Sequence, residues 1–262
     1  MISVAIQNLG LVTEGINDWQ QASLVLQGDS DYQGGELSPL KPSMLKPNER
    51  RRTTRTIKIA LQAAEQALQH LPDREGITSV FSSSEGDLDI IDQICLALTE
   101  EGRPVSPTQF HNSVHNAPAG YWSIGTGSRQ GSSSLGGLNG SFAAGLMEAA
   151  VQCSVEQTPV LLVCYDQPPP HLLQPFMPIS TPFSIAMLLT AESDNCIARL
   201  DLNTCSEDQQ SVMSKAALET LRLSAPAARS LPLLEALAKA QAANINLPYL
   251  PGLNLQAELH PC

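Results

Sequence analysis

The sequence has few charged residues, and few of those are basic. Charged residues make up 16% of the 262 positions, and 15 Lys and Arg stand against 26 Asp and Glu. The formal net charge of −11 argues against nucleic acid as the main ligand, because phosphate binding needs clustered positive charge. No apolar run is long enough to cross a bilayer, and no basic stretch precedes the apolar Ile2–Ile6 as in a signal peptide. We therefore expect a cytoplasmic protein with no membrane span.

The cysteines form no metal-binding pattern. Six are present, none lies in a CxxC pair, and their spacings match no zinc motif. Scattered cysteines in a chain of this length are typical of small buried hydrophobes with reduced thiols. We expect no metal and no cofactor.

Alternation of apolar strands and helical periodicities predicts an α/β fold. Val160–Tyr165 is a continuous apolar run, typical of a parallel strand covered on both faces, and Phe142–Val155 is an alanine-rich helix. The segments 184–190 and 196–202 suggest a closing hairpin, and apolar spacing predicts one helix over 49–70. We expect a mostly parallel central sheet flanked by helices over residues 1–205. Residues 206–262 are expected to form a helical extension packed on the same domain.

Two motifs resemble ligand sites without meeting their requirements. In Gly125–Gly131 the third glycine comes one place late for GxGxxG, and the loop precedes a strand instead of opening a helix. His111 and His115 lie four positions apart, which would place them on one helix face, but HNSVH lacks the glutamate of HExxH. A structural polar cluster near an interface is favoured over a metal site.

The segment Gly136–Ser141 runs from a strand into a buried helix, a geometry in which exposed N–H groups stabilise negative charge. An enzyme would place Cys or Ser at the apex, where Leu138 and Asn139 stand. Ser141 could act only beside a base, and an N-cap role for it is favoured.

The most specific stretch is Phe110–Ile124, FHNSVHNAPAGYWSI. It resembles the β-ketoacyl synthase (thiolase-like) family, in particular the small chain-length-factor-type proteins of aryl polyene biosynthesis. Further resemblance lies in 82–86, 141–150, 160–166 and 182–191, so that it covers roughly residues 1–200. The resemblance implies the N-terminal half of a thiolase-like fold.

The resemblance also implies roles for individual residues. Asn116 and Gly120 match the Asn-x-x-x-Gly segment that ketoacyl synthases place at their dimer interface beside the acyl pocket. The family's nucleophilic cysteine would fall near Asn139, yet no cysteine lies between Cys95 and Cys153. The second-half histidines are also unmatched, since neither His171 nor His260 lies in such a motif. The expected partner-interface and acyl-pocket residues are His111, His115, Asn116, Gly120, Tyr121, Asn139 and Phe142.

Basic residues gather in one short segment. Seven of the 15 Lys and Arg fall between Lys41 and Lys58. One interpretation is a solvated helix entry; the other is a docking patch for an acidic partner such as an acyl carrier protein. The candidate docking residues are Lys46, Arg50, Arg51, Arg52 and Arg55.

These observations favour a pseudoenzyme, a non-catalytic chain-length-factor-like subunit. It would form a heterodimer with a full-length β-ketoacyl synthase in type II polyketide or fatty-acid-like (aryl polyene) biosynthesis. There it would help to shape the acyl-chain pocket, with an acyl carrier protein as a further partner. The alternative is a stand-alone acyl-transferring or hydrolytic enzyme that uses Ser141 with His111 or His115.

Overall fold

The computed structural model describes residues 1–71, 73–102, 104–191, 194–206 and 209–262, so residues 207 and 208 of the predicted helical extension lie outside it. Its strands form one eight-stranded sheet in the order β3-β2-β4-β5-β1-β6-β8-β7. The strands are β1 (Ile2–Thr13), β2 (Thr78–Ser82), β3 (Ser132–Leu135), β4 (Val160–Asp166), β5 (Phe183–Thr190), β6 (Ala198–Cys205), β7 (Ala243–Leu250) and β8 (Leu253–Pro261).

The α/β fold is confirmed, but the expectation of a mostly parallel sheet is wrong. Among the described strands only β2 pairs in parallel, with β3 on one side and β4 on the other. All remaining pairs are antiparallel. The sheet is therefore mixed and mostly antiparallel.

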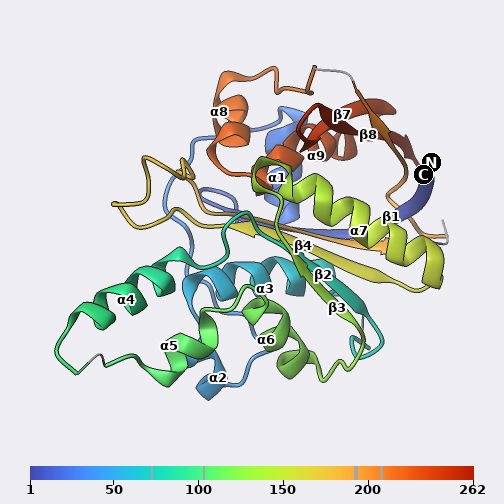
Figure 1. Cartoon of the computed structure of the whole chain (residues 1–262). Helices are drawn as coiled ribbons and strands as arrows, with labels where there is room; N and C mark the ends of the chain where they lie inside the picture. The colour runs from blue at the N-terminus through green and yellow to red at the C-terminus, as the bar shows by residue number, and fades with distance from the viewer. Residues whose placement is uncertain (72, 103, 192–193, 207–208) are drawn as a thin grey trace.

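The helices cover the sheet on both faces (Figure 1). They are α1 (Trp19–Gln27), α2 (Pro47–Arg52), α3 (Arg55–Ala67), α4 (Leu88–Thr99), α5 (Pro107–Asn112), α6 (Ala117–Thr126), α7 (Ser141–Glu156), α8 (Ala216–Ser224) and α9 (Leu231–Ala238), with short 3₁₀ turns η1 (Leu138–Gly140) and η2 (Ala227–Ser230). The predicted helix over 49–70 is two helices, since Thr53 is extended and Thr54 caps α3 by accepting a hydrogen bond from the N–H of Ile57.

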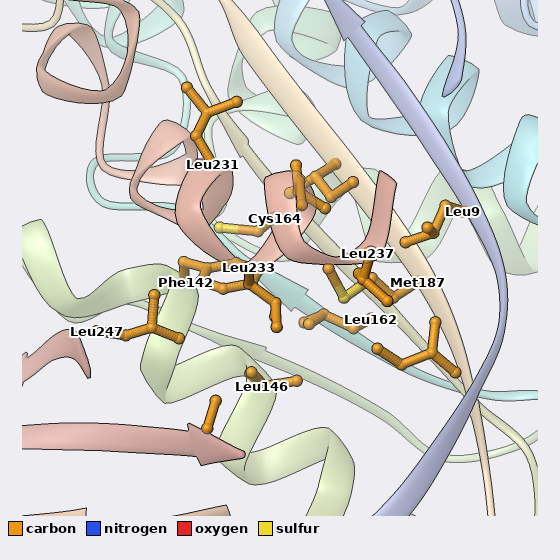
Figure 2. Close-up of a cluster of buried hydrophobic side chains, with 14 of the residues drawn as sticks. Leu9, Phe142, Leu146, Leu162, Cys164, Met187, Leu231, Leu233, Leu237 and Leu247 are labelled. Carbon is orange, nitrogen blue, oxygen red and sulfur yellow. The ribbon is translucent and has the colours of Figure 1, made fainter. Parts of the chain in front are cut away.

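Helix α7 lies in the middle of the molecule (Figure 1). One side packs on β1, β2 and β4, while β7 and η2 contact another side. Figure 2 shows how this core is shared: Phe142 and Leu146 of α7 gather with Leu162 of β4, Met187 of β5 and Leu247 of β7. The twisted sheet thus wraps around α7, and this position fixes where the N-terminus of α7 emerges.

The segment after residue 205 was expected to be helical. It also contains the strands β7 and β8, which extend the main sheet. The signal was present: Leu253, Leu255, Ala257 and Leu259 alternate with polar residues at the period of a strand. The predicted hairpin of 184–190 with 196–202 is also wrong, since β1 pairs with both strands and lies between them. The expectation of reduced thiols is wrong for Cys196 and Cys262, which form a disulfide with Cα atoms 6.0 Å apart, and Cys95 is exposed instead of buried.

Candidate functional site

The turn from β3 into α7 is a tight elbow with an exposed apex. Leu138 has φ 51° and is 67% exposed, although a residue with a Cβ rarely adopts the left-handed region. Two residues later only glycine fits, because a Cβ on Gly140 would lie 2.0 Å from the carbonyl oxygen of Tyr249 in β7. The backbone is thus held in a strained form, with Leu138 and Asn139 facing outward at the helix start.

The hydroxyl of Ser141 forms hydrogen bonds within the elbow. It donates to the carbonyl oxygen of Leu138 at 2.7 Å and accepts from the N–H of Gly137 at 3.0 Å. Ser141 is fully buried and is the first residue of α7, whose N-cap is Gly140, so the predicted N-cap role is wrong. Within the described residues, no hydrogen bond joins it to an imidazole, because the ring of His115 bonds the carbonyl oxygen of Ser83. The geometry gives Ser141 a structural contact in place of a general base.

Two cavities adjoin the elbow and share Leu138 and Asn139. One, of about 370 Å³, opens toward the turn between β7 and β8 at Tyr249–Gly252. The other, of about 270 Å³, lies between the elbow, the loop Phe176–Ile179 and η2. Asn139 is exposed and lies just before the start of the central helix α7.

A buried carboxylate supports the base of this site. Asp166, at the end of β4, accepts hydrogen bonds from the N–H and hydroxyl of Ser84 at 2.9 and 2.8 Å. Its second oxygen accepts from the N–H of Ala227 at 2.7 Å. Burial raises the pKa of Asp166 to about 6, although these hydrogen bonds act in the opposite direction. The carboxylate links β4, the loop after β2 and η2 in one network.

A second groove lies between α6 and β3 and brings together three of the predicted interface residues. His115, Asn116 and Gly120 line a cavity of about 500 Å³ with Ser132 and Ser134 of β3. The hydroxyl of Ser134 is buried and, in the part of the chain that the structure describes, has no hydrogen-bond partner. The serines were missed because a short polar strand at a sheet edge carries no hydrophobic signal.

Three predicted interface residues lie elsewhere. Tyr121 is buried and donates a hydrogen bond to Asn112, and Phe142 belongs to the core around α7, so neither offers surface to a partner. His111 is exposed, with its ring edge against Tyr121 at 6.1 Å between centroids. His111 and His115 do not share a helix face, since α5 ends at Asn112 and α6 starts at Ala117.

The basic segment forms α2 and its flanks. Lys46, Arg51, Arg52 and Arg55 are exposed and Arg50 is half-buried. Arg52 pairs with Glu49 at 3.9 Å, and Asn112 of α5 donates to the backbone carbonyl of Arg52. The predicted docking residues thus share one surface beside α5.

The remaining motifs have structural roles or no partners. Gly127 ends α6 in a left-handed C-cap, and the chain then enters β3, which explains the glycines of Gly125–Gly131. Among the described residues, no three His, Cys, Asp or Glu side chains gather in a way that could hold a metal ion. Within the same ranges, none of the helices has the length and hydrophobicity that crossing a bilayer requires.

Comparisons with known proteins agree with the observed fold. The model of a family described as "Beta-ketoacyl synthase, N-terminal domain" matches residues 18–248, and no curated protein matches. A chain of the ketosynthase ApeO in complex with its chain length factor ApeC, from Xenorhabdus doucetiae, is similar with a TM-score of 0.76 and 19% identity, covering 98% of this chain and 100% of that one.

Two further solved structures are similar to this chain to different extents. For a chain of the ishigamide ketosynthase/chain length factor, the TM-score is 0.75 at 14% identity, with 100% of this chain and 99% of that one covered. A beta-ketoacyl synthase from Burkholderia phymatum gives 0.62 at 14% identity, with 92% of this chain but only 71% of that one covered. At these identities the likeness establishes the fold.

Proposed function

The chain belongs to the β-ketoacyl synthase family, whose N-terminal domain it matches over 18–248, and we propose that it is a non-catalytic, chain-length-factor-like subunit. It pairs with a full-length β-ketoacyl synthase in type II polyketide or fatty-acid-like biosynthesis, of the aryl polyene kind, and helps to shape the acyl-chain pocket. The similarity to chains of ketosynthase and chain length factor complexes supports this assignment.

The observation that carries the proposal is the elbow. A decarboxylative condensation needs a nucleophile whose negative charge the N–H groups at a helix start can stabilise. The geometry is present, but its exposed apex carries Leu138 and Asn139, and the hydroxyl of Ser141 is buried and donates to a carbonyl. The site retains the scaffold of the reaction with side chains that cannot form a thioester.

The two ends of the sheet differ in a way that suits pairing through β3. The edge of β7 is covered, since Ser211 donates its N–H to the carbonyl of Asn246 at 2.9 Å and accepts from the N–H of Asn246 at 3.0 Å. Within the described residues β3 has a strand on one side only, and beside it lies the groove of His115, Asn116 and Gly120. An open edge next to a polar groove is suited to a partner's strand.

Helices α4 and α5, on another part of the molecule, expose apolar side chains that a soluble surface would not favour. In α4 the only buried residue is Ile90, while Ile91, Leu96 and Leu98 are exposed. Phe110 of α5 is 67% exposed and Val114 follows it. Gln109 bonds Gln93, so α4 and α5 form one continuous surface, which projects from the body in Figure 1. Exposed apolar patches of this kind mark interaction sites.

The basic surface of α2 is proposed as the carrier-protein contact. It lies beside α5, so a carrier protein bound there would also reach the partner synthase. Lys46, Arg51, Arg52 and Arg55 present their charges to solvent, and reversing Arg51 and Arg52 to Glu should abolish carrier binding while pairing with the synthase persists.

The test of pairing is co-expression with the cognate synthase, followed by size-exclusion chromatography with light scattering. We expect a stable heterodimer, and Phe110→Asp should weaken its association by about tenfold or more, because it places a charge in an apolar contact. Val155→Asp is a matched control, since Val155 is 76% exposed on α7, away from α4 and α5. A monomeric chain in the presence of the synthase, with normal products made in its absence, contradicts the proposal.

A further inference from the structure

Glu219 and Arg222 of α8 form a tight pair, and the carboxylate accepts three hydrogen bonds in all. Arg222 donates from Nε and Nη2 to the two carboxylate oxygens of Glu219 at 2.7 and 2.6 Å. The N–H of Met213 donates to the same carboxylate at 2.8 Å. The acceptor sites of Glu219 are therefore engaged from both sides.

Arg229, in η2, lies close to this pair without taking part in it. Arg229 is half-buried, its Nε is shielded from solvent, and in the described ranges no hydrogen bond or ion pair of its side chain is found. Burial and the charge of Arg222 lower the pKa of Arg229, whereas Glu219 acts in the opposite direction. A buried guanidinium nitrogen without an acceptor, beside another arginine, is costly, and an anion nearby would offset the positive charge of the two.

Arg229 forms part of the wall of the 270 Å³ cavity between the elbow and the loop Phe176–Ile179. Most of the lining is apolar, including Phe176, Ile179 and Leu223. Asn139 at the start of α7 supplies a polar group on another wall, and the helix N-terminus there favours negative charge. The cavity thus combines one free positive charge with an apolar chamber.

Glu85 is the one carboxylate among the described lining residues, and it bears on what the cavity can hold. Its charge opposes a second negative charge on any ligand. A singly charged group should therefore bind better than a doubly charged one.

We propose that this cavity is a binding site for a small organic anion, with a carboxylate or phosphate group at Arg229 and an apolar portion against Phe176 and Leu223. The inference does not depend on pairing with a synthase, because every group that it uses belongs to this chain.

The test is isothermal titration of the full chain with hexanoate, with hexyl phosphate and with the neutral hexanamide. We expect saturable binding of hexanoate, weaker binding of hexyl phosphate above its second pKa, and no comparable binding of hexanamide. Tighter binding of hexyl phosphate would identify the charged end as a phosphate and contradict the role given to Glu85.

If the proposal is right, three variants differ in their effect on the affinity for hexanoate. Arg229→Gln should weaken hexanoate binding by about tenfold or more, because a charge-assisted hydrogen bond is lost. Glu85→Gln should tighten it by about threefold or more, because a like charge is removed. Arg129→Gln removes the same charge from an exposed position before β3 and should change nothing.

The urea midpoint of each variant is measured as a check on its folding. Arg229→Gln removes a charge next to Arg222 and should not lower the midpoint; if it does, Arg229→Lys keeps the charge and should bind more tightly than the Gln variant. The proposal is wrong if hexanamide binds as well as hexanoate, if Arg229→Gln leaves the affinity unchanged, or if Arg129→Gln has the same effect.

Discussion

The buried carboxylate of Asp166 accepts a 2.7 Å hydrogen bond from the backbone N–H of Ala227, a residue 61 positions later in the chain. This contact joins the end of β4, below the elbow, to the 3₁₀ turn that carries Arg229. The loop at Ser84 and the turn η2, which both contribute to the 270 Å³ cavity, are therefore joined through one buried acid.

Asp166 should make stability pH-dependent. Burial raises its pKa from 3.8 to about 6, so the folded chain binds a proton more readily than the unfolded chain between these two values. Its contribution to stability is fully present below about pH 4 and is lost as the pH rises through about 6. We expect the advantage of the wild type over Asp166→Asn, measured by urea unfolding, to shrink from pH 4 to 7 by about 1–3 kcal/mol. An advantage that grows over this range would show that the hydrogen bonds outweigh burial.

The disulfide should stabilise the chain under oxidising conditions. Cys196 and Cys262 are 66 positions apart, and closing a loop of that length constrains the unfolded chain by at most about 4 kcal/mol. We expect dithiothreitol to lower the urea midpoint of the wild type and to leave that of Cys196→Ser unchanged. Cys95→Ser, which removes an exposed free thiol, should respond to the reductant as the wild type does. Equal midpoints for the wild type with and without reductant would contradict a stabilising role.

Much of the central layer follows from local sequence, while the placement of the strands does not. The continuous apolar run of β4 and the alanine-rich α7 can be recognised in the sequence, since buried strands and buried helices are rich in apolar residues. By contrast, the apolar Ile2–Ile6 is followed by the polar Gln7 and Asn8, where the pairing of β1 with β5 shifts register, so the local pattern does not show that the strand continues to Thr13. Its full length is what separates β5 from β6. Non-local pairing of this kind depends on contacts between distant segments and leaves no periodicity in either one.

The candidate sites divide in the same manner. The elbow could be located because glycines and a strand-to-helix transition are local features, and Asn139 lies within it. Tyr121 and Phe142 were misplaced because an aromatic residue in a motif gives no indication of whether it faces the core or the surface. Arg222, Glu219 and Arg229 were missed altogether, since their spacing on α8 and η2 resembles that of any solvated helix. Only the three-dimensional arrangement shows that Arg229 lies close to the Arg222–Glu219 pair.

Leu138 carries a measurable strain. A left-handed φ of 51° costs a residue with a Cβ about 1 kcal/mol, and its exposed side chain recovers little of this by packing. Leu138→Gly should therefore raise the free energy of unfolding by about 0.5–1 kcal/mol, after allowance for the greater freedom of glycine in the unfolded chain. Asn139→Gly is a suitable comparison, since Asn139 is exposed but has no positive φ, and it should not stabilise the chain. A loss of stability in Leu138→Gly would mean that the side chain makes contacts that outweigh the strain.

A substitution at Gly120 should affect the stability of the chain and its pairing in opposite directions. It lies within α6, is exposed, and a Cβ at this position would meet no atom within 4 Å. Gly120→Ala should therefore stabilise the isolated chain by about 0.5–1 kcal/mol, because alanine loses less backbone entropy in a helix. In the proposed heterodimer the same methyl group would project into the groove between α6 and β3, where a partner is expected, and should weaken association. If Gly120→Ala pairs with the synthase as tightly as the wild type does, the groove is not covered by the partner, and the interface must lie on another surface.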